Sequence, residues 1–249
     1  MTKLELIKNA KPILFNTDMV RAILSGHKTA TRRVIKQPPT RKFVGWVIDG
    51  GKNQIGCAVF SNDEYNHTGA EYRKPKYEIG DVLYVRETWC KLHSLDGNDQ
   101  IIDDTEKYYY AADNPAFLYN KFLHKDGTAK VYQTWKPSIH MPKEAARLFL
   151  RVTDIRVERL QSITGEDIEN EGFEFKCPNE HIDYTPDPPE PCYISGNCYH
   201  YPKMYCDQEC VWGYECWDNT IKKKDLKIYG WDANPWVWVV EFEKVNVDG

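Results

Sequence analysis

The feature that most constrains the fold of this chain is a set of strand-like runs that are separated by loops and short helices, without a long regular alternation of strands and helices. These runs are rich in β-branched or aromatic residues and cover Val82–Val85, Lys107–Asp113, Leu148–Leu160 and Trp236–Val245. A long alternation of strands and helices would indicate a parallel α/β fold, and the sequence lacks it. The pattern therefore predicts an α+β domain built around a mixed or antiparallel β-barrel with short flanking helices.

Two short helices are predicted from their caps and periodicity. Asp18–Ser25 places apolar residues at i, i+3 and i+4, and Gly26 follows as a stop signal. Gly165–Glu171 begins after a Ser/Thr cap, carries acids in its first turn and ends at Gly172. The residues between Gly26 and the next apolar run, GHKTATRR, then form a basic turn.

Charge and hydropathy narrow the classes of protein that the chain can belong to. A net charge of −4, with 28% charged residues, argues against a generally basic nucleic-acid coat protein. Any contact with nucleic acid must then come from a local patch. No stretch approaches the roughly 20 apolar residues that span a bilayer, and the N-terminus lacks a signal-peptide layout, so we expect a cytoplasmic protein without membrane contact.

The basic octapeptide at residues 26–33 has a structural and a chemical interpretation. Charge runs are commonly solvated surface. A threonine hydroxyl, however, becomes a nucleophile when a neighbouring base takes its proton, and nearby cations lower the pKa of a lysine toward that role. Lys28 and Thr31 have this spacing, and Arg32 and Arg33 supply the cations. A carboxylate would complete the set, and composition does not say which one.

Four ordered blocks resemble the ASCH domain, in particular its long prophage versions. They read ILSGHKTATRR, GDVLYVRETW, VTDIRVERLQSITGEDIENEGF and WDANPWVWVVEF. The resemblance implies a single domain over 1–249 with a PUA-like β-barrel, a fold associated with RNA binding and RNA modification. Residues 36–77 and 91–134 are then loop-rich insertions with weak strands, and 174–230 is a cysteine-rich insertion.

The resemblance also implies a set of catalytic residues. Some small ASCH proteins are amidohydrolases that deacetylate N4-acetylcytidine with a lysine, a threonine and a glutamate. Their motif lies at Gly26–Arg33, which makes Lys28 the base and Thr31 the nucleophile, and their glutamate corresponds to Glu171. The chain departs from the motif at His27 and Arg32. Other ASCH proteins bind or cleave RNA, so a non-catalytic RNA- or nucleotide-binding module and a ribonuclease are alternatives.

Substrate contacts are expected near this set. Arg32 and Arg33 are candidate substrate-binding residues, and backbone N–H groups of the 26–33 turn or Arg33 are candidate donors to an oxyanion. Trp135 is a candidate base-stacking surface, with core packing as the alternative. His140 is a further candidate, with a structural hydrogen bond as the alternative. The expected partner is RNA or a modified nucleoside, and the oligomeric state is not predicted.

Six of the eight cysteines fall between residues 177 and 216. The pairs Cys206–Cys210 and Cys192–Cys198 fit two halves of a tetrahedral structural zinc site, for which His181 and His200 are alternative ligands. A metal would supply folding energy in a segment with little apolar periodicity. Free thiols or an iron–sulfur cluster are the alternatives, and no cofactor is expected for catalysis.

Overall fold

A computed structural model describes residues 2–49, 51, 54–63, 68–92, 107–113, 122–123, 129–130, 135–173 and 216–246. The chain forms two compact units. The first comprises Met1–Gly26, Ile79–Thr153 and Phe242–Gly249, and the second comprises His27–Glu78 and Asp154–Glu241. Two long strands, β11 (Phe149–Arg159) and β12 (Trp236–Val245), contribute residues to both units.

The first unit contains two N-terminal helices and a small sheet. In this unit β1 pairs in parallel with β6, and β6 pairs antiparallel with the start of β11. A separate antiparallel pair joins β7 to β8. The elements are α1 (Lys3–Asn9), β1 (Lys11–Leu14), α2 (Thr17–Ser25), β6 (Val82–Arg86), β7 (Trp89–Leu92), β8 (Lys107–Tyr110), β9 (Phe122–Leu123) and β10 (Ala129–Lys130).

Helix α2 shows why its sequence forms a helix at this place. The Asn16 side chain accepts a hydrogen bond from the backbone N–H of Met19, so Asn16 is the N-cap. Gly26 ends the helix with φ of +86°, a left-handed conformation that disfavours a β-carbon. The predicted helix is thus confirmed, one residue longer than expected.

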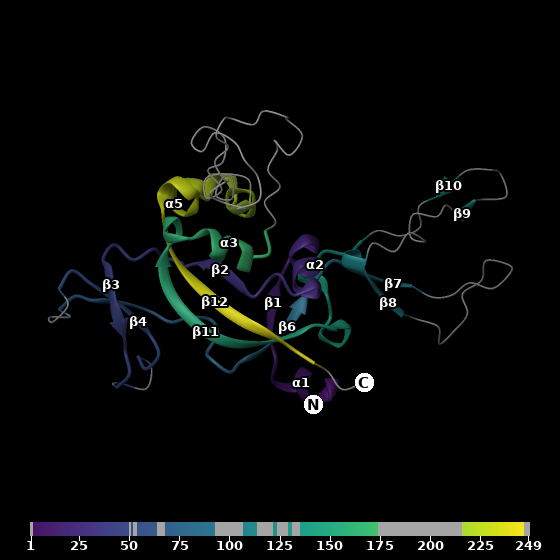
Figure 1. Ribbon diagram of the computed structural model, residues 1–249, viewed down its shortest axis with the longest axis horizontal. Coiled ribbons are helices and arrows are strands. Elements are labelled where there is room, and N and C mark those ends of the chain that lie inside the picture. Colours follow the sequence, from purple (N-terminus) through teal and green to yellow (C-terminus); the bar gives the residue numbers. More distant parts are fainter. Residues whose placement is uncertain are drawn as a thin grey trace, which may run out of the picture. The chain divides into compact units, whose positions relative to one another are not determined.

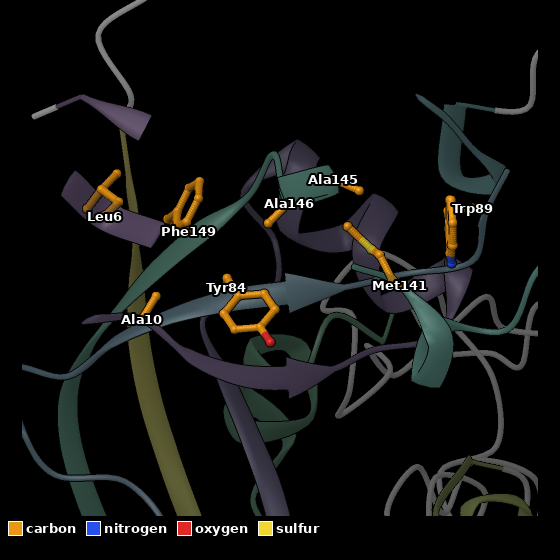
Figure 2. Close-up of a cluster of buried hydrophobic side chains, with 8 residues drawn as sticks. All are labelled: Leu6, Ala10, Tyr84, Trp89, Met141, Ala145, Ala146 and Phe149. Atoms are coloured by element: carbon orange, nitrogen blue, oxygen red, sulfur yellow. The ribbon is translucent and has the colours of Figure 1, made fainter. Parts of the chain in front are cut away.

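The core of the first unit gathers side chains from its helices and strands. Figure 2 shows Leu6 beside Phe149, and Met141 beside Trp89. The fully buried carboxylate Glu87 adjoins this region. The complete cluster is Leu6, Ala10, Tyr84, Trp89, Met141, Ala145, Ala146 and Phe149.

Glu87 is 1% exposed and is paired with Arg147 through two hydrogen bonds of 2.9 Å. Burial raises the pKa of Glu87, although the Arg147 charge opposes this. The same guanidinium contacts Asp113 at 2.8 Å and lies 4.0 Å from the ring centre of Tyr110. A buried carboxylate is therefore held by an arginine that also packs against an aromatic ring.

The second unit contains β2 and a three-stranded antiparallel sheet. Strand β2 (Ala30–Val34) pairs antiparallel with β12, with Thr31 opposite Val240 and Arg33 opposite Trp238. The separate sheet has the order β3-β4-β5. Its strands are β3 (Lys42–Trp46), β4 (Ala58–Ser61) and β5 (Glu71–Arg73), and the helices of this unit are α3 (Gly165–Asn170) and α5 (Leu226–Tyr229).

The core of the second unit lies between β12 and the helical segments. Helices α3 and α5 lie on the same side of β2 and β12 (Figure 1). Two buried tryptophans anchor the segment that carries α5. The cluster consists of Leu160, Ile163, Ile168, Trp217, Trp231, Val237 and Val239.

The expected α+β class is confirmed, because helices and several mixed or antiparallel sheets occur together. The main order of hydrogen-bonded strands is β1-β6-β11-β12-β2, and within the described residues it does not close into a barrel. The expected turn at residues 30–33 is wrong, since these residues begin β2. No helix among the described ranges is long and apolar enough to cross a membrane.

Candidate functional site

The candidate site lies in the second unit, where Lys28 meets Glu171. Lys28 Nζ is 2.8 Å from Glu171 Oε2, and the two side chains are 0% and 6% exposed. The backbone brings them together: the two residues form an isolated antiparallel bridge, and the N–H of Thr29 donates to the carbonyl of Asn170 at 2.8 Å. The end of α3 is thus attached to the chain that leads into β2.

Local sequence explains why Glu171 arrives at this position. Thr164 starts α3 with a capping box in which its side chain and that of Asp167 bond each other's backbone N–H. Glu171 is the C-cap, and Gly172 follows with φ of +81°. The positive φ ends the helix directly after Glu171, so its carboxylate lies at the end of α3 beside Lys28.

The Lys28 ammonium has three hydrogen-bond acceptors. They are Glu171 Oε2 at 2.8 Å, the Glu171 carbonyl at 2.7 Å and the Ala30 carbonyl at 2.8 Å. Burial lowers the pKa of Lys28, Glu171 opposes this, and the charges of Arg33 and Arg32 add to the lowering. The site therefore bonds the charged lysine fully while its surroundings favour the neutral form.

Both oxygens of the Glu171 carboxylate are in use. Oε2 accepts from Lys28, and Oε1 accepts from the backbone N–H of Arg32 at 2.6 Å. The Arg32 guanidinium also lies 3.5 Å from Oε1. The carboxylate is thereby held between two cations and a strand N–H.

Arg32 belongs to an ion-pair network that sequence reasoning missed. Its side chain is fully buried, and Nη2 lies 3.3 Å from Glu158 and 3.1 Å from Asp167. Arg156 contacts the same two carboxylates and also Glu241. The alternation of Arg156 and Glu158 on one face of β11 was the available signal.

Asp167 shows the effect of this network on titration. Burial raises the pKa of its carboxyl, but hydrogen bonds from Thr164 and the charge of Arg32 outweigh burial, and the pKa is lowered. Asp167 therefore stays charged and balances the buried Arg32.

Thr31 and Arg33 share one face of β2, because alternate residues of a strand point to the same side. Thr31 is 1% exposed. Within the described part of the chain, no hydrogen bond joins its hydroxyl to Lys28 Nζ, whose three donors are taken by other acceptors. Arg33 is half-buried, and burial lowers its pKa against the opposing charges of Glu171 and Tyr77.

The structure limits the expected oxyanion donors. The backbone N–H groups of Thr29 and Arg32 already donate to Asn170 and Glu171. Arg32 Nε is buried and, among the described residues, has no hydrogen-bond partner. This Nε belongs to the guanidinium that lies 3.5 Å from Glu171 Oε1, so it is a side-chain donor beside the pair that the described residues leave unused.

The remaining candidate residues lie elsewhere. Trp135 is half-buried and His140 is exposed, and both belong to the first unit. The described ranges contain no group of three or more His, Cys, Asp or Glu that could hold a metal. The four proposed zinc ligands, Cys192, Cys198, Cys206 and Cys210, lie outside the described residues.

Comparisons of the chain with protein-family models, with curated proteins and with solved structures gave no match.

Proposed function

We propose that this protein is a nucleoside-directed amidohydrolase with a PUA-like ASCH domain, which removes the acyl group from an N4-acylated cytidine through Lys28, Thr31 and Glu171. The observation that carries the proposal is the buried 2.8 Å contact between Lys28 and Glu171, two residues that lie 143 positions apart in the chain. A lysine whose pKa is lowered by burial, beside a carboxylate that accepts its proton, is suited to activate a hydroxyl.

The proposed reaction begins with proton transfer from Lys28 to Glu171 Oε2. The neutral amine takes the proton of the Thr31 hydroxyl, and Thr31 Oγ forms a bond to the acyl carbon. Collapse of the tetrahedral intermediate breaks the carbon–nitrogen bond, and the leaving exocyclic amine receives the proton that Glu171 holds, which restores the Lys28 ammonium and the Glu171 carboxylate. Water then hydrolyses the acyl-threonine, which releases the acid and restores the hydroxyl.

Two features of the resting site must change during this reaction. Lys28 Nζ has to leave one of its carbonyl acceptors to reach Thr31 Oγ. Thr31 is 1% exposed, so the substrate has to displace neighbouring side chains. Arg33, on the same face of β2 as Thr31, is the proposed donor to the oxyanion.

Acetate release from N4-acetylcytidine by the purified protein tests the proposal. Thr31→Ala removes the nucleophile and should abolish release. Thr29→Ala is the matched control: Thr29 is exposed two residues away, and its hydroxyl bonds only the Asn170 side chain among the contacts described, so this variant should keep its activity. Equal activity of wild type and Thr31→Ala, or no release by the wild type, would contradict the proposal.

A non-catalytic nucleotide-binding module is the second candidate, and the three acceptors around Lys28 Nζ favour it. A fully bonded ammonium is a poor base and a good structural clamp. This candidate predicts binding of the nucleoside without acetate release. Isothermal titration with N4-acetylcytidine, run beside the acetate assay, separates the two.

A further inference from the structure

The segment Ile221–Tyr229 concentrates positive charge on a chain whose net charge is −4. Its sequence, IKKKDLKIY, contains four lysines and one acid. All four lysines are exposed: Lys222, Lys223, Lys224 and Lys227. None of them forms an ion pair with a carboxylate of the described residues, whereas exposed lysines such as Lys74 do. Four lysines against one acid give the segment a net positive charge, which attracts a polyanion.

A pocket of about 470 Å³ lies beside this segment, within the second unit. One wall, at and just after the end of β2, consists of Val34, Lys36 and Gln37, and the other consists of Thr220, Ile221, Lys222, Asp225 and Tyr229. Lys36 and Lys222 place a cation on each wall, and Tyr229 adds an aromatic ring. Asp225 is the acid that lines it among the residues that the structure describes. Two cations and a ring around one cavity match the needs of a phosphate and an unpaired base.

The wall that carries Lys222 and Tyr229 is held in place by two buried tryptophans. Trp217 Nε1 donates to the Tyr229 carbonyl at 2.8 Å, and the Trp231 N–H donates to Asp218 at 2.7 Å. Both rings belong to the core under α3 and β12. A wall that is ordered before binding loses little conformational entropy on binding.

The pocket lies along β2 from the Lys28 site. Val34 lines the pocket and follows Lys28 by six residues. The four steps of β2 from Ala30 to Val34 alone cover about 13 Å at about 3.3 Å per residue, and Lys28 lies two residues before this strand. Helix α3, which ends at Glu171 of the Lys28 site, and helix α5, which contains Tyr229 of the pocket, lie on the same side of β2 (Figure 1). A ligand that reaches both sites must be longer than one nucleoside.

We infer that this pocket binds the phosphate backbone of a single-stranded nucleic acid, with Lys36 and Lys222 at the phosphates and Tyr229 stacked on a base. A single strand fits because stacking on Tyr229 needs an unpaired base. Combined with the proposed function, on which this last step rests, a strand that carries the acylated cytidine reaches both sites and binds more tightly than the free nucleoside does.

Fluorescence anisotropy with a labelled oligouridylate, titrated over a salt series, tests the pocket. The Lys36→Glu/Lys222→Glu variant should bind at least about tenfold more weakly, and its log–log salt slope should be smaller by about 1.4, because each phosphate contact on a single strand contributes about 0.7. Asp225→Asn removes the repelling acid and should bind more tightly than wild type.

The matched control is Lys8→Glu/Lys244→Glu, which makes the same change in net charge with two exposed lysines of the first unit. It should keep the wild-type affinity to within about twofold and the wild-type slope. An oligodeoxythymidylate arm distinguishes RNA from single-stranded DNA as the source of the backbone. No binding by wild type, equal losses in both double variants, or tighter binding of a duplex would overturn the inference.

Binding is measured without turnover, so the two proposals fail separately. If the protein releases acetate from the nucleoside and does not bind the oligonucleotide, the proposed pocket is refuted and the proposed amidohydrolase activity is supported. If the protein binds the oligonucleotide through the lysines and releases no acetate, the proposed amidohydrolase activity is refuted and the proposed pocket is supported.

Discussion

Replacing Glu171 by glutamine tests whether the buried pair with Lys28 stabilises the second unit. Glu171 Oε2 accepts from Lys28 and Oε1 accepts from the Arg32 N–H. In glutamine one of these positions becomes an NH₂ group, which turns one hydrogen bond into a donor–donor contact. The ammonium is also left buried without its counter-charge.

Two independent estimates bound the free energy of unfolding that Glu171→Gln removes. Breaking a buried ion pair costs about 3–5 kcal/mol. Lys28 can instead lose its proton, which from an ordinary pKa of 10.5 costs about 5 kcal/mol at pH 7 and less here, because burial already lowers that pKa. We therefore expect a loss of about 3–4 kcal/mol, or roughly 10 °C in Tm for a chain of this size.

Urea unfolding of wild type and Glu171→Gln, at neutral and at alkaline pH, measures this loss. The folded-state pKa of Lys28 lies below its unfolded value, so the unfolded state binds more protons between the two values and stability rises with pH there. With Glu171 absent this window widens, and the cost of the substitution should shrink as the pH rises toward 10.5.

A surface pair supplies the control. Lys74 and Glu78 lie 3.4 Å apart with side chains 50% and 64% exposed, and Glu78→Gln should cost less than about 1 kcal/mol at any pH. If Glu171→Gln costs no more than Glu78→Gln, or if its cost does not fall with rising pH, the reasoning about the buried pair is wrong.

Two further predictions concern Tyr110 in the first unit and a comparison of Gly230 in the second unit with Gly26 in the first. Burial raises the pKa of Tyr110 from 10.0 to about 12, so the folded state keeps a proton that the unfolded state loses. The free energy of unfolding should therefore fall as the pH rises from 10 toward 12. In the Tyr110→Phe variant, urea midpoints measured across this pH range should no longer show that fall. A β-carbon at Gly230 would lie 2.6 Å from the Leu226 carbonyl oxygen, so Gly230→Ala should lower the free energy of unfolding by about 1–3 kcal/mol and loosen the pocket wall. At Gly26 no atom lies within 4 Å of an added β-carbon, so Gly26→Ala should cost only the strain of its positive φ, about 1–2 kcal/mol. Thermal unfolding measures both variants. A larger loss of stability for Gly26→Ala than for Gly230→Ala would contradict the predicted clash at Gly230.

Elements with strong local patterns were predicted closely from the sequence. The strand expected over Trp236–Val245 has those bounds, and the helix expected over Gly165–Glu171 is α3 with Glu171 as its cap. The strand expected over Leu148–Leu160 is β11, shorter by one residue at each end. Caps, turn glycines and apolar alternation act within a few residues, so they are readable from the sequence.

Strand β2 shows where local patterns are insufficient. Its sequence, ATRRV, has two adjacent arginines, and local sequence allows both a solvated basic turn and part of a chemical site at residues 26–33. In the structure the Arg32 side chain is fully buried, because Glu158 and Glu171 supply counter-charges from 126 and 139 residues away. Burial of a charge is decided by its partner, and the partner is a long-range contact.

The sequence by itself determined the α+β class, the start and end of its best-capped helix, and the residue types that a Lys/Thr/Glu site needs. Only the tertiary structure decided that Lys28 and Glu171 touch, that Arg32 serves the ion-pair network, and that Lys36 faces a cavity shared with Lys222. The physical reason is distance along the chain. Helix caps and strand alternation depend on neighbouring residues, whereas ion pairs and cavities depend on segments that meet only after the chain has folded.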